Sequence, residues 1–495
     1  MLLVIWTVVL LAVLTIWYNK TYSRFSSYGV KNLKVVPFFG NMTRIIFRVC
    51  HFAENLEQSY FSFPNEKFIG RYELVKPIVI VRDIDLIKRI TIKDFEYFLD
   101  HRGFADEKIE PLFARNLFSL KGEEWKDMRS TLSPAFTSSK IKLMVPFMEE
   151  VGEQMIRALK KKIKDSDCMD NVHLYYYFCI CLSAGSIDVE CKDLTTRYAN
   201  DVIASCAFGL KVDSHTDVDN QFYEMGKVAS TFKFRQQLLF FALSACPGLV
   251  RVSQLSHDDK ASNGTAQDTG FATVEESALG KKSITRVWTD YDLTAQAVLF
   301  FIAGFDTIST GMSFGLYELA LHPDVQDRLA KEIKEEHAKN GGKLNFNAIQ
   351  KVLRLWPPAQ FLDRLCTKDY NLGKPNDDAT EDYIIRKGEN LAIPVWCFHR
   401  DSRYFPDPKK FDPERFSEEN KHNINPMAYM PFGLGPRNCI GSRFALCELK
   451  SLLYQIILHF EVTPSERTCI PAQLSTETFN PKLKGGHWLR FKIRS

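Results

Sequence analysis

Residues 431–441 read Pro-Phe-Gly-Leu-Gly-Pro-Arg-Asn-Cys-Ile-Gly, and the apolar-periodic segment SRFALCELKSLLYQIILHF follows them at 442–460. The glycines and prolines indicate a tight, rigid loop, and the periodicity after the loop predicts a helix. Cys439 therefore stands at the start of a helix, where free N–H groups and the positive end of the helix dipole favour a thiolate. The alternative is a buried structural cysteine in a glycine-rich turn.

The spacing Phe-x-x-Gly-x-Arg-x-Cys-x-Gly favours a ligand over a plain turn. A single thiolate in an apolar loop suits an axial bond to a haem iron. Phe432 would then supply a packing face beside the sulfur, and Gly441 would allow close approach of a flat macrocycle. Arg437 would pair with a haem propionate. The loop thus predicts a haem-thiolate centre.

Composition excludes several other classes of protein. The chain has 495 residues, of which 45% are hydrophobic and 25% charged, enough apolar surface to exclude a disordered chain. The formal net charge is only +4, and no long Lys/Arg block is present, so no nucleic-acid partner is predicted. The 12 cysteines form no Cys-x-x-Cys pair, which argues against a disulfide scaffold and a structural zinc cluster.

The N-terminal segment predicts a membrane anchor. Residues 1–18 carry no charge and would span about 27 Å as a helix, the thickness of an endoplasmic reticulum bilayer. Basic residues follow in a linker and Pro/Gly hinge at 19–40, with no acidic residue before Glu54. This charge pattern predicts a single-pass protein whose main body faces the cytosol. A cleaved signal peptide is the alternative, but residues 1–18 lack a basic start and a small-residue cleavage site.

The remainder, residues 41–495, is predicted to be one mainly α domain with small β-sheets, an α+β fold. Residues 70–82 and 383–395 are rich in β-branched residues and predict the sheets. Residues 290–322 predict a helix of about 50 Å that crosses the core and stops at Pro323. Two segments fit this pattern poorly: 251–284 is polar and predicts an exposed loop, and 172–182 is aromatic and β-prone. A zinc or redox site formed by His173, Cys179 and Cys181 is the less favoured interpretation of the second segment.

Two polar residues, Asp306 and Thr307, interrupt the long apolar helix. Buried polar groups are costly unless they are hydrogen-bonded, so this pair needs an explanation. Thr307 can bond to the carbonyl of Ala303 and bend the helix, and Ala303 and Gly304 would leave a notch for O₂ and water. Thr307 and Asp306 would then supply protons during oxygen activation. A kinked core helix is the alternative.

These residues closely resemble the motifs of the cytochrome P450 haem-thiolate monooxygenases, in the expected order along nearly the whole chain. Trp125-Lys-Asp-Met-Arg129 resembles the family's Trp-x-x-x-Arg helix, Ala303–Thr307 its oxygen-activation motif, and Pro413–Phe416 the segment that locks the haem loop. The stretches RNLFSLKGEEWKDMRSTLSPAFTSSK, RLWPPAQFLDRLC and NCIGSRFALCELK resemble the insect, microsomal, xenobiotic-metabolising branch in particular.

The resemblance implies a specific reaction and set of partners. Haem b (iron protoporphyrin IX) would be bound through Cys439, with Trp125, Arg129 and Arg437 holding its propionates. Electrons would come from NADPH through NADPH–cytochrome P450 reductase, with cytochrome b5 as a possible second donor. One oxygen atom of O₂ would enter a lipophilic small molecule at the endoplasmic reticulum membrane. The basic residues that would dock an acidic reductase are Lys126, Lys140, Lys142, Arg443 and Lys450, and a solvated helix face is the alternative.

One departure from the family pattern stands out. The family carries Glu-x-x-Arg, whose ion pair joins the arginine found here as Arg415, whereas this chain has Lys351-Val-Leu-Arg354. Three like charges, Lys351, Arg354 and Arg415, would meet without an acid. Segments 167–184 and 251–284 also depart from the pattern. A catalytically impaired or non-functional haem protein is therefore a second hypothesis. A third is a haem-thiolate isomerase or dehydratase, against which the pair Asp306 and Thr307 counts.

Overall fold

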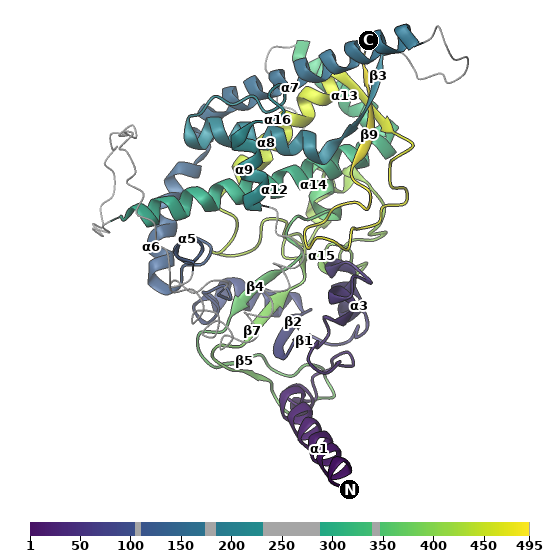
Figure 1. The fold of residues 1–495 in the computed structure, drawn as a ribbon. Coiled ribbons are helices and arrows are strands. Elements are labelled where there is room, and N and C mark those ends of the chain that lie inside the picture. The colour runs from purple at the N-terminus through teal and green to yellow at the C-terminus, as the bar shows by residue number, and fades with distance from the viewer. Residues whose placement is uncertain (104–109, 174–184, 231–287, 339–346, 495) are drawn as a thin grey trace, which may run out of the picture.

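Most of the long helices gather at one end of the molecule, with a few strands among them, and most of the strands lie toward the other end (Figure 1). The computed structural model describes residues 1–103, 110–173, 185–230, 288–338 and 347–494. The helices are α1 (Leu2–Tyr22), α2 (Thr43–Ile46), α3 (Phe52–Phe61), α4 (Ile84–Lys88), α5 (Pro111–Ala114), α6 (Gly122–Leu132), α7 (Ser138–His173), α8 (Cys191–Phe208), α9 (Gln221–Ser230), α12 (Asp290–Leu321), α13 (Pro323–Ala338), α14 (Asn347–Leu355), α15 (Val395–Phe398) and α16 (Ser442–His459).

The strands are short and form three small sheets. They are β1 (Phe68–Glu73), β2 (Lys76–Val81), β3 (Ser186–Glu190), β4 (Leu362–Leu365), β5 (Tyr370–Asn371), β6 (Ile384–Ile385), β7 (Asn390–Ile393), β8 (Phe460–Pro464) and β9 (Trp488–Ile493). The sheets have the orders β1-β2-β7-β4, β3-β9-β8 and β5-β6. Only the pair β2–β7 is parallel among these described strands. The predicted strand regions 70–82 and 383–395 are therefore confirmed, and so is the mainly α fold with small sheets.

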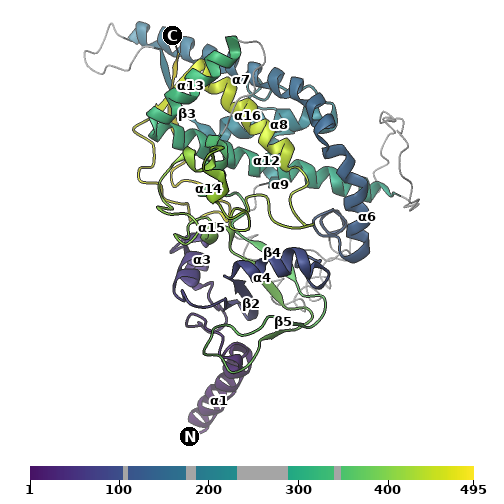
Figure 2. The ribbon, with the colours of Figure 1, turned by 180° about the vertical axis from the view of Figure 1, so that it is seen from behind.

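Helix α12 crosses the helical end of the molecule, between α8 on one side and α14 and α16 on the others (Figures 1 and 2). Its start is fixed by a capping box, in which Thr289 Oγ1 accepts from the Asp292 amide and the Asp292 carboxylate accepts in return. Every residue from Ile308 to Ala320 is buried. Full burial of a large apolar side chain contributes about 1.5–3 kcal/mol, so this half of α12 anchors the helical core. The predicted core-crossing helix at 290–322 is confirmed.

Of the four hydrophobic clusters among the described residues, the two largest form the main cores of the molecule. One joins α7, α8, α12, α13, α14 and α16 with β8 and β9, and the other surrounds β1, β2 and β7. Segments far apart in sequence meet in the second core, because β2 pairs with β7 across more than 300 residues. The loop before α16 lies between these two cores, since Phe432 packs on the first and Leu434 on the second.

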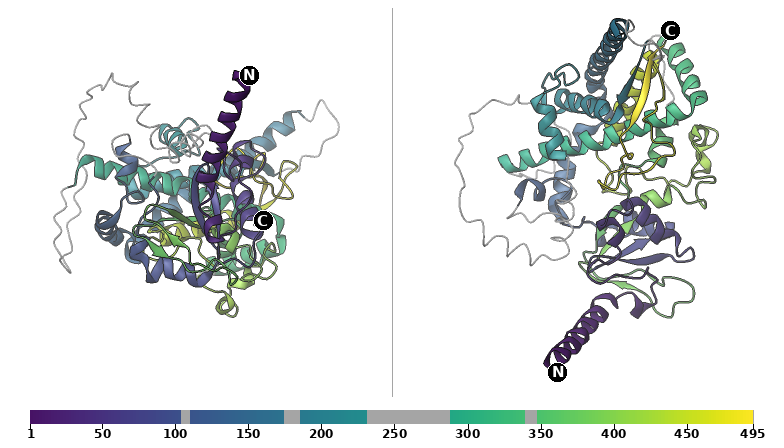
Figure 3. Two further views of the ribbon diagram at one scale, coloured as in Figure 1. Left: turned by 90° about the horizontal axis from the view of Figure 1, so that it is seen from below. Right: turned by 45° about the vertical axis from the view of Figure 1, so that its right-hand side comes forward.

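Helix α1 projects from the β-rich end, away from the helical core (Figure 3). It is apolar and long enough to cross a membrane, and none of its most apolar window is buried. Its last turns contact the body, because Trp17 stacks on Phe38 at 4.6 Å and the buried Tyr22 packs against Tyr72. The helix extends four residues beyond the predicted segment 1–18. Helix α12 passes the same test of length and composition but is a core helix.

Several predictions fall outside the described residues. The expected loop at 251–284 lies there, and so do Cys179 and Cys181 of the less favoured zinc or redox site. Within the described ranges, no group of three or more His, Cys, Asp or Glu side chains is placed to hold a metal ion.

Candidate active site

The loop before α16 is shaped by two glycines with positive φ. Gly433 and Gly435 have φ of 78° and 70°, in the left-handed region. A Cβ on Gly435 would lie 1.9 Å from the backbone oxygen of Thr91, so only glycine fits. The Cys439 amide donates to the Phe432 carbonyl over 2.8 Å and closes the loop. The loop therefore holds Cys439 just before α16, as the sequence predicts.

The Cys439 side chain is exposed, but protein atoms surround its sulfur on most sides. Burial therefore raises the pKa of the thiol above its usual value. The Gly441 N–H and the Arg129 guanidinium act in the opposite direction. The predicted thiolate preference at a helix start is thus wrong for the free thiol, because desolvation outweighs these two groups. Bonding of the sulfur to a metal ion would deprotonate it.

Arg437 ties this loop to the segment that precedes α6. It is 8% exposed, and its Nε and Nη2 donate to the carbonyls of Leu99 and Leu120, each over 2.7 Å. Its guanidinium lies 4.0 Å from the centre of the Trp125 ring. Burial lowers the pKa of Arg437 to about 9, although the Asp100 carboxylate 3.6 Å away opposes this shift. Backbone carbonyls thus occupy donors that the sequence assigned to a haem propionate.

Helix α6 brings Trp125 and Arg129 to the same loop, one helical turn apart. Trp125 is 4% exposed. Arg129 donates to the carbonyl and to the side-chain oxygen of Asn438, over 2.8 and 2.9 Å. Asn438 directly precedes Cys439, so Arg129 lies close to the sulfur. The two ends of the predicted Trp-x-x-x-Arg motif therefore meet the cysteine loop.

Phe432 and Gly441 flank the cysteine. Phe432 is half-buried and packs against the helical core. Gly441 caps α16, and a Cβ there would meet only the ring of Phe136, at 3.7 Å. No described protein group crowds Gly441, so its small size is not required by protein packing.

Arg364 on β4 is a residue that the sequence reasoning missed. It is 1% exposed, and its Nε has no hydrogen-bond partner among the described residues. Its Nη2 donates to the carbonyl of Leu434 over 3.3 Å, and its charge lowers the pKa of Arg437. The adjacent charges Asp363 and Arg364 inside an apolar strand were a signal that could have found it.

On α12, Thr307 and Ala303 are both exposed, whereas Phe305 is buried. Thr307 Oγ1 donates to the Ala303 carbonyl over 2.5 Å, which confirms the predicted back-bond. Thr307 is not a buried polar group, so the burial argument from the sequence is wrong for it. The predicted notch also needs correction, because a Cβ on Gly304 would lie 2.6 Å from Ile203. Gly304 lets α12 approach α8, and only Ala303 remains on the open face beside Thr307.

Asp306 faces α8, on another side of α12 from Thr307. Its carboxylate lies 3.0 Å from Lys192 Nζ and accepts from Asn480 Nδ2. Lys192 also donates to Ser309 Oγ and Thr310 Oγ1, over 2.6 and 2.8 Å. Desolvation lowers the pKa of Lys192, while Asp306 raises it. The sequence identified Asp306 but not its cationic partner, which lies more than 100 residues away.

The departure from the family pattern produces a buried basic cluster. Lys351 and Arg354 on α14 are both 0% exposed, and Arg415 lies on the adjoining turn Pro413–Phe416. Burial, with Arg354 and Arg415 next in effect, lowers the pKa of Lys351 to about 6. The prediction that no acid is present needs correction, because Asp412 Oδ2 lies 3.7 Å from Arg415 Nε. Asp412 sits in the same turn, three residues before Arg415.

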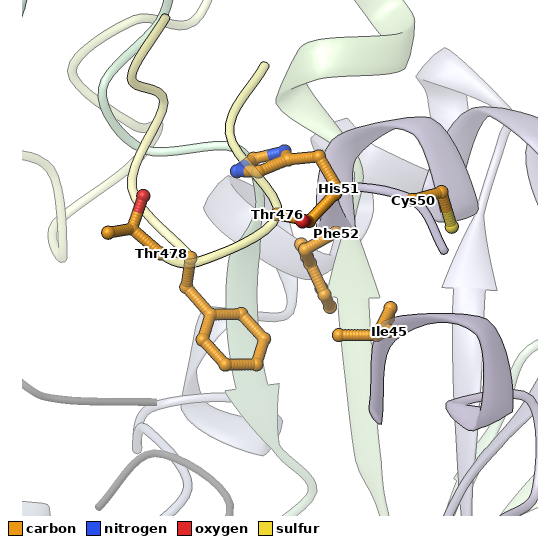
Figure 4. A pocket seen from close by; sticks show the side chains of 7 residues that line it. Ile45, Cys50, His51, Phe52, Thr476 and Thr478 are labelled. Atoms are coloured by element: carbon orange, nitrogen blue, oxygen red, sulfur yellow. The ribbon is translucent and has the colours of Figure 1, made fainter. Parts of the chain in front are cut away.

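A small hollow beside α2 and α3 has no group of charged side chains like that around Cys439. Ile45, Cys50, His51, Phe52, Thr476, Thr478 and Phe479 line it (Figure 4). It has no interior room for a water molecule. His51 caps α3 there, and burial lowers the pKa of its imidazole to about 4. The cysteine loop remains the better candidate site.

Comparison with known proteins agrees with this arrangement. The sequence profile described as Cytochrome P450 matches residues 31–487. Cytochrome P450 9e2 of Blattella germanica is 40% identical over 528 positions, covering 99% of this chain and 97% of that protein. Probable cytochrome P450 9f2 of Drosophila melanogaster is 37% identical, covering 97% of this chain and 96% of that protein. Cytochrome P450 6j1 of Blattella germanica is 33% identical, covering 93% and 91%.

A mainly helical domain with small sheets and a cysteine loop before its long C-terminal helix is the architecture of a haem-thiolate oxidoreductase. The chain belongs to the cytochrome P450 family and is a monooxygenase, similar to named insect relatives. The alignment of 528 positions exceeds the 495 residues of the chain, so the chain has gaps relative to cytochrome P450 9e2.

The family implies a haem cofactor, and the residues present fit one. The loop offers a single thiol with Arg129, Arg364 and Arg437 near it, a soft ligand beside cationic groups suited to an anionic macrocycle. The unpaired, buried Nε of Arg364 is a further donor that an anionic carboxylate would satisfy.

Proposed function

We propose that this P450 inserts one oxygen atom of O₂ into lipophilic small molecules, xenobiotic or endogenous, and holds haem b through the Cys439 sulfur. The observation that carries the proposal is the convergence of the Cys439 thiol with the α6 and loop arginines. When bound, haem supplies the redox-active iron that activates O₂. The side chains of this chain would bind the haem, shield its sulfur ligand and deliver protons.

Cys439 sets the electronic character of the iron, because a thiolate pushes electron density that favours O–O cleavage. Trp125, Arg129 and Arg437 would hold the propionates, and the structure adds Arg364 as a fourth candidate. Phe432 would pack beside the sulfur and shield it from water. Gly441 would leave room for the macrocycle.

Thr307 and Asp306 would manage protons. Thr307 lies on the exposed face of α12, where its hydroxyl would be available to donate a proton to bound O₂. Its proton is engaged by the Ala303 carbonyl, so donation to another acceptor requires the hydroxyl to turn about the Cβ–Oγ1 bond and break this hydrogen bond. Asp306 would take protons from solvent and pass them on, and its ion pair with Lys192 must loosen for this.

The membrane and redox partners follow from the same assignment. Residues 1–18 would anchor the protein in the endoplasmic reticulum membrane as a single span, with 19–40 as linker and 41–495 as the haem domain in the cytosol. NADPH–cytochrome P450 reductase would supply electrons, with cytochrome b5 as a second donor. The exposed Lys140, Lys142, Arg443 and Lys450 favour docking of an acidic partner. Lys126 favours it less, because it already pairs with Glu96 and Glu123.

The test is the carbon monoxide difference spectrum of the reduced, detergent-solubilised full chain. The proposal expects the red-shifted Soret band of a thiolate ligand. Cys439→Ala should abolish this band, while Cys447→Ala, a cysteine two turns into α16, should leave it in place. A retained band in Cys439→Ala would overturn the ligand assignment.

One observation favours a second candidate, a chain that does not retain haem. Lys351 is fully buried, and its Nζ has no hydrogen-bond partner in the part of the chain that the structure describes. Below about pH 6 its amine is protonated, and an unpaired buried charge typically costs about 3–5 kcal/mol, comparable with the stability of a domain. The same spectrum decides: no pigment in the purified chain would favour this candidate. Turnover of peroxides without NADPH would instead favour an isomerase or dehydratase.

A further inference from the structure

Three cationic side chains lie where α14 packs on the turn Pro413–Phe416, and each has a hydrogen-bond donor without a partner among the described residues. Lys351 Nζ, Arg354 Nε and Arg415 Nε are all buried atoms without a hydrogen-bond partner among the described residues. Lys351 and Arg354 lie three residues apart on α14, so they share a face of the helix. This face packs on the turn that carries Arg415. The three donors therefore belong to one site.

The other donors of these residues show how the cluster is built. Arg354 Nη1 donates to the His399 carbonyl over 2.5 Å and Nη2 to the Pro408 carbonyl over 2.7 Å. Arg415 Nη2 donates to the Asp407 carbonyl over 3.3 Å. Backbone carbonyls thus hold both ends of the Arg354 guanidinium and one end of that of Arg415. Neither Nε atom has a hydrogen-bond partner among the described residues, and Arg415 Nε lies 3.7 Å from the Asp412 carboxylate.

The charges of the cluster do not balance. Lys351, Arg354 and Arg415 supply three positive charges when the amine is protonated. The two acids that act on the lysine are Asp412, 3.7 Å from Arg415, and Glu318 of α12. Glu318 also accepts from Trp356 Nε1 over 2.7 Å, but the indole is neutral, so the charge of Glu318 stays in the count. One negative charge is missing.

The remaining nearby cation does not change this balance. Arg400 acts on Arg354, but it has its own carboxylate, Glu57, at 3.6 Å. It also lies against the ring of Trp396. The missing negative charge therefore concerns only Lys351, Arg354 and Arg415.

We propose that a small monovalent anion, of the size of chloride or formate, binds between Lys351 Nζ, Arg354 Nε and Arg415 Nε and supplies the missing charge. Three buried donors on two packed elements, each without a hydrogen-bond partner among the described residues, offer a site for an acceptor ion. A single charge suffices to neutralise the cluster. The full burial of Lys351 and Arg354 restricts the ion to one that sheds its water readily and fits a packed interior. Because unfolding destroys the site, the ion stabilises the fold.

Thermal unfolding of the full chain in detergent at about pH 5.5, where the Lys351 amine is protonated, tests the proposal. The chain is titrated with sodium chloride or sodium formate, with sodium gluconate holding the ionic strength constant. Tm should rise and saturate with the small anions but not with gluconate, which is too large to enter. A rise with only one of the two small anions identifies the ion that fits, and equal behaviour of all three salts overturns the proposal. Absence of a cooperative transition in every salt also overturns it, because the ion is required to offset the unpaired charge.

Variants separate this site from general salt effects. Lys351→Glu supplies a carboxylate, so it should lose the anion response and, in gluconate, unfold at or above the Tm of the saturated parent. Lys351→Met removes one cation, balances the cluster and should also lose the response. Lys164→Glu makes the same charge change on an exposed part of α7 and should keep the response. A response that persists in Lys351→Met and Lys351→Glu would refute the site. None of these readouts depends on haem or on turnover.

Discussion

At the scale of single residues, the effect of a substitution on stability depends on backbone conformation and on unpaired charge more than on residue type alone. Gly435 is required because Thr91 approaches it, and Lys351 is costly because nothing described pairs with it. Gly435 lies in the cysteine loop, and Lys351 lies in the motif that departs from the family pattern. Each therefore gives a prediction that a side-chain change can test.

Gly435→Ala should destabilise the protein much more than Gly209→Ala. Both glycines have positive φ, 70° and 65°, so both substitutions introduce backbone strain of about 1 kcal/mol. Only at Gly435 would the new Cβ clash, at 1.9 Å from Thr91, whereas nothing lies within 4 Å at Gly209. We expect an added loss of about 2 kcal/mol or more in the free energy of unfolding for Gly435→Ala. Equal losses in urea denaturation of the two variants would contradict the clash.

The free energy of unfolding should increase with pH above about 6 because of Lys351. Its pKa is about 6 in the folded chain against an ordinary value of 10.5, so the unfolded chain binds one more proton between these values. Stability then rises with pH by about 1.4 kcal/mol per unit in this window. Below about pH 6 both states bind the proton, and the slope from this group ends.

Lys351→Met provides the measurement of this effect. In gluconate buffer the variant should be more stable than the parent near pH 6.5, and this advantage should shrink by about 2–3 kcal/mol by pH 8.5. Urea denaturation at both pH values gives the comparison. A difference between the two proteins that does not change with pH would show that the amine titrates normally.

At the scale of elements, α12 carries different chemistry on different sides. Thr307 and Ala303 lie on its exposed face, Gly304 allows contact with α8, and Asp306 binds Lys192 across that contact. The periodicity of the sequence predicts the helix, but adjacent residues on a helix point about 100° apart. Asp306 and Thr307 therefore act as a pair only if the ion pair with Lys192 opens.

Lys192→Met should destabilise the protein by about 2–3 kcal/mol, because it leaves the part-buried Asp306 carboxylate without its cation. The matched control is Arg157→Met, which breaks the exposed ion pair with Glu153 on α7 and should cost at most about 1 kcal/mol. Chemical denaturation of both variants gives the two values. A loss for Lys192→Met no larger than the control would mean that the pair does not join α12 to α8.

At the scale of the whole molecule, the anchor and the body are joined by the last turns of α1. Trp17, Tyr18 and Tyr22 contact the β-rich end, and Tyr18 donates to the Val35 carbonyl over 3.3 Å. The residues before them are exposed. The exposed part of α1, residues 2–16, can therefore be removed without disturbing the fold.

Deleting residues 2–16 should release the protein from membranes while leaving its Tm unchanged, because Trp17 and the residues after it keep their contacts. Fractionation of cells that express the deletion, followed by a high-salt wash, provides the measurement. Retention of the washed protein on membranes would reveal a second attachment surface. A lowered Tm would show that the exposed part of α1 also supports the fold.

Sequence and structure agree where the signal is local. Helical periodicity predicts α12 and α16, β-branched runs predict β1, β2 and β7, and glycine and proline spacing predicts the cysteine loop. Each of these depends on residues within one element, so a single chain reveals them. The same holds for the back-bond from Thr307 to Ala303, which spans one helical turn.

The sequence by itself determined the fold class, the cysteine loop and the missing glutamate at Lys351. Only the tertiary structure decided which partners the charged groups take: Lys192 for Asp306, backbone carbonyls for Arg437, and Asp412 in part for Arg415. It also revealed that Arg364 contacts the cysteine loop, and that Lys351, Arg354 and Arg415 each have a buried donor without a hydrogen-bond partner among the described residues. The physical reason is that ion pairs, desolvation and steric contact depend on distances between residues far apart in sequence, and those distances exist only after the helices and sheets have packed.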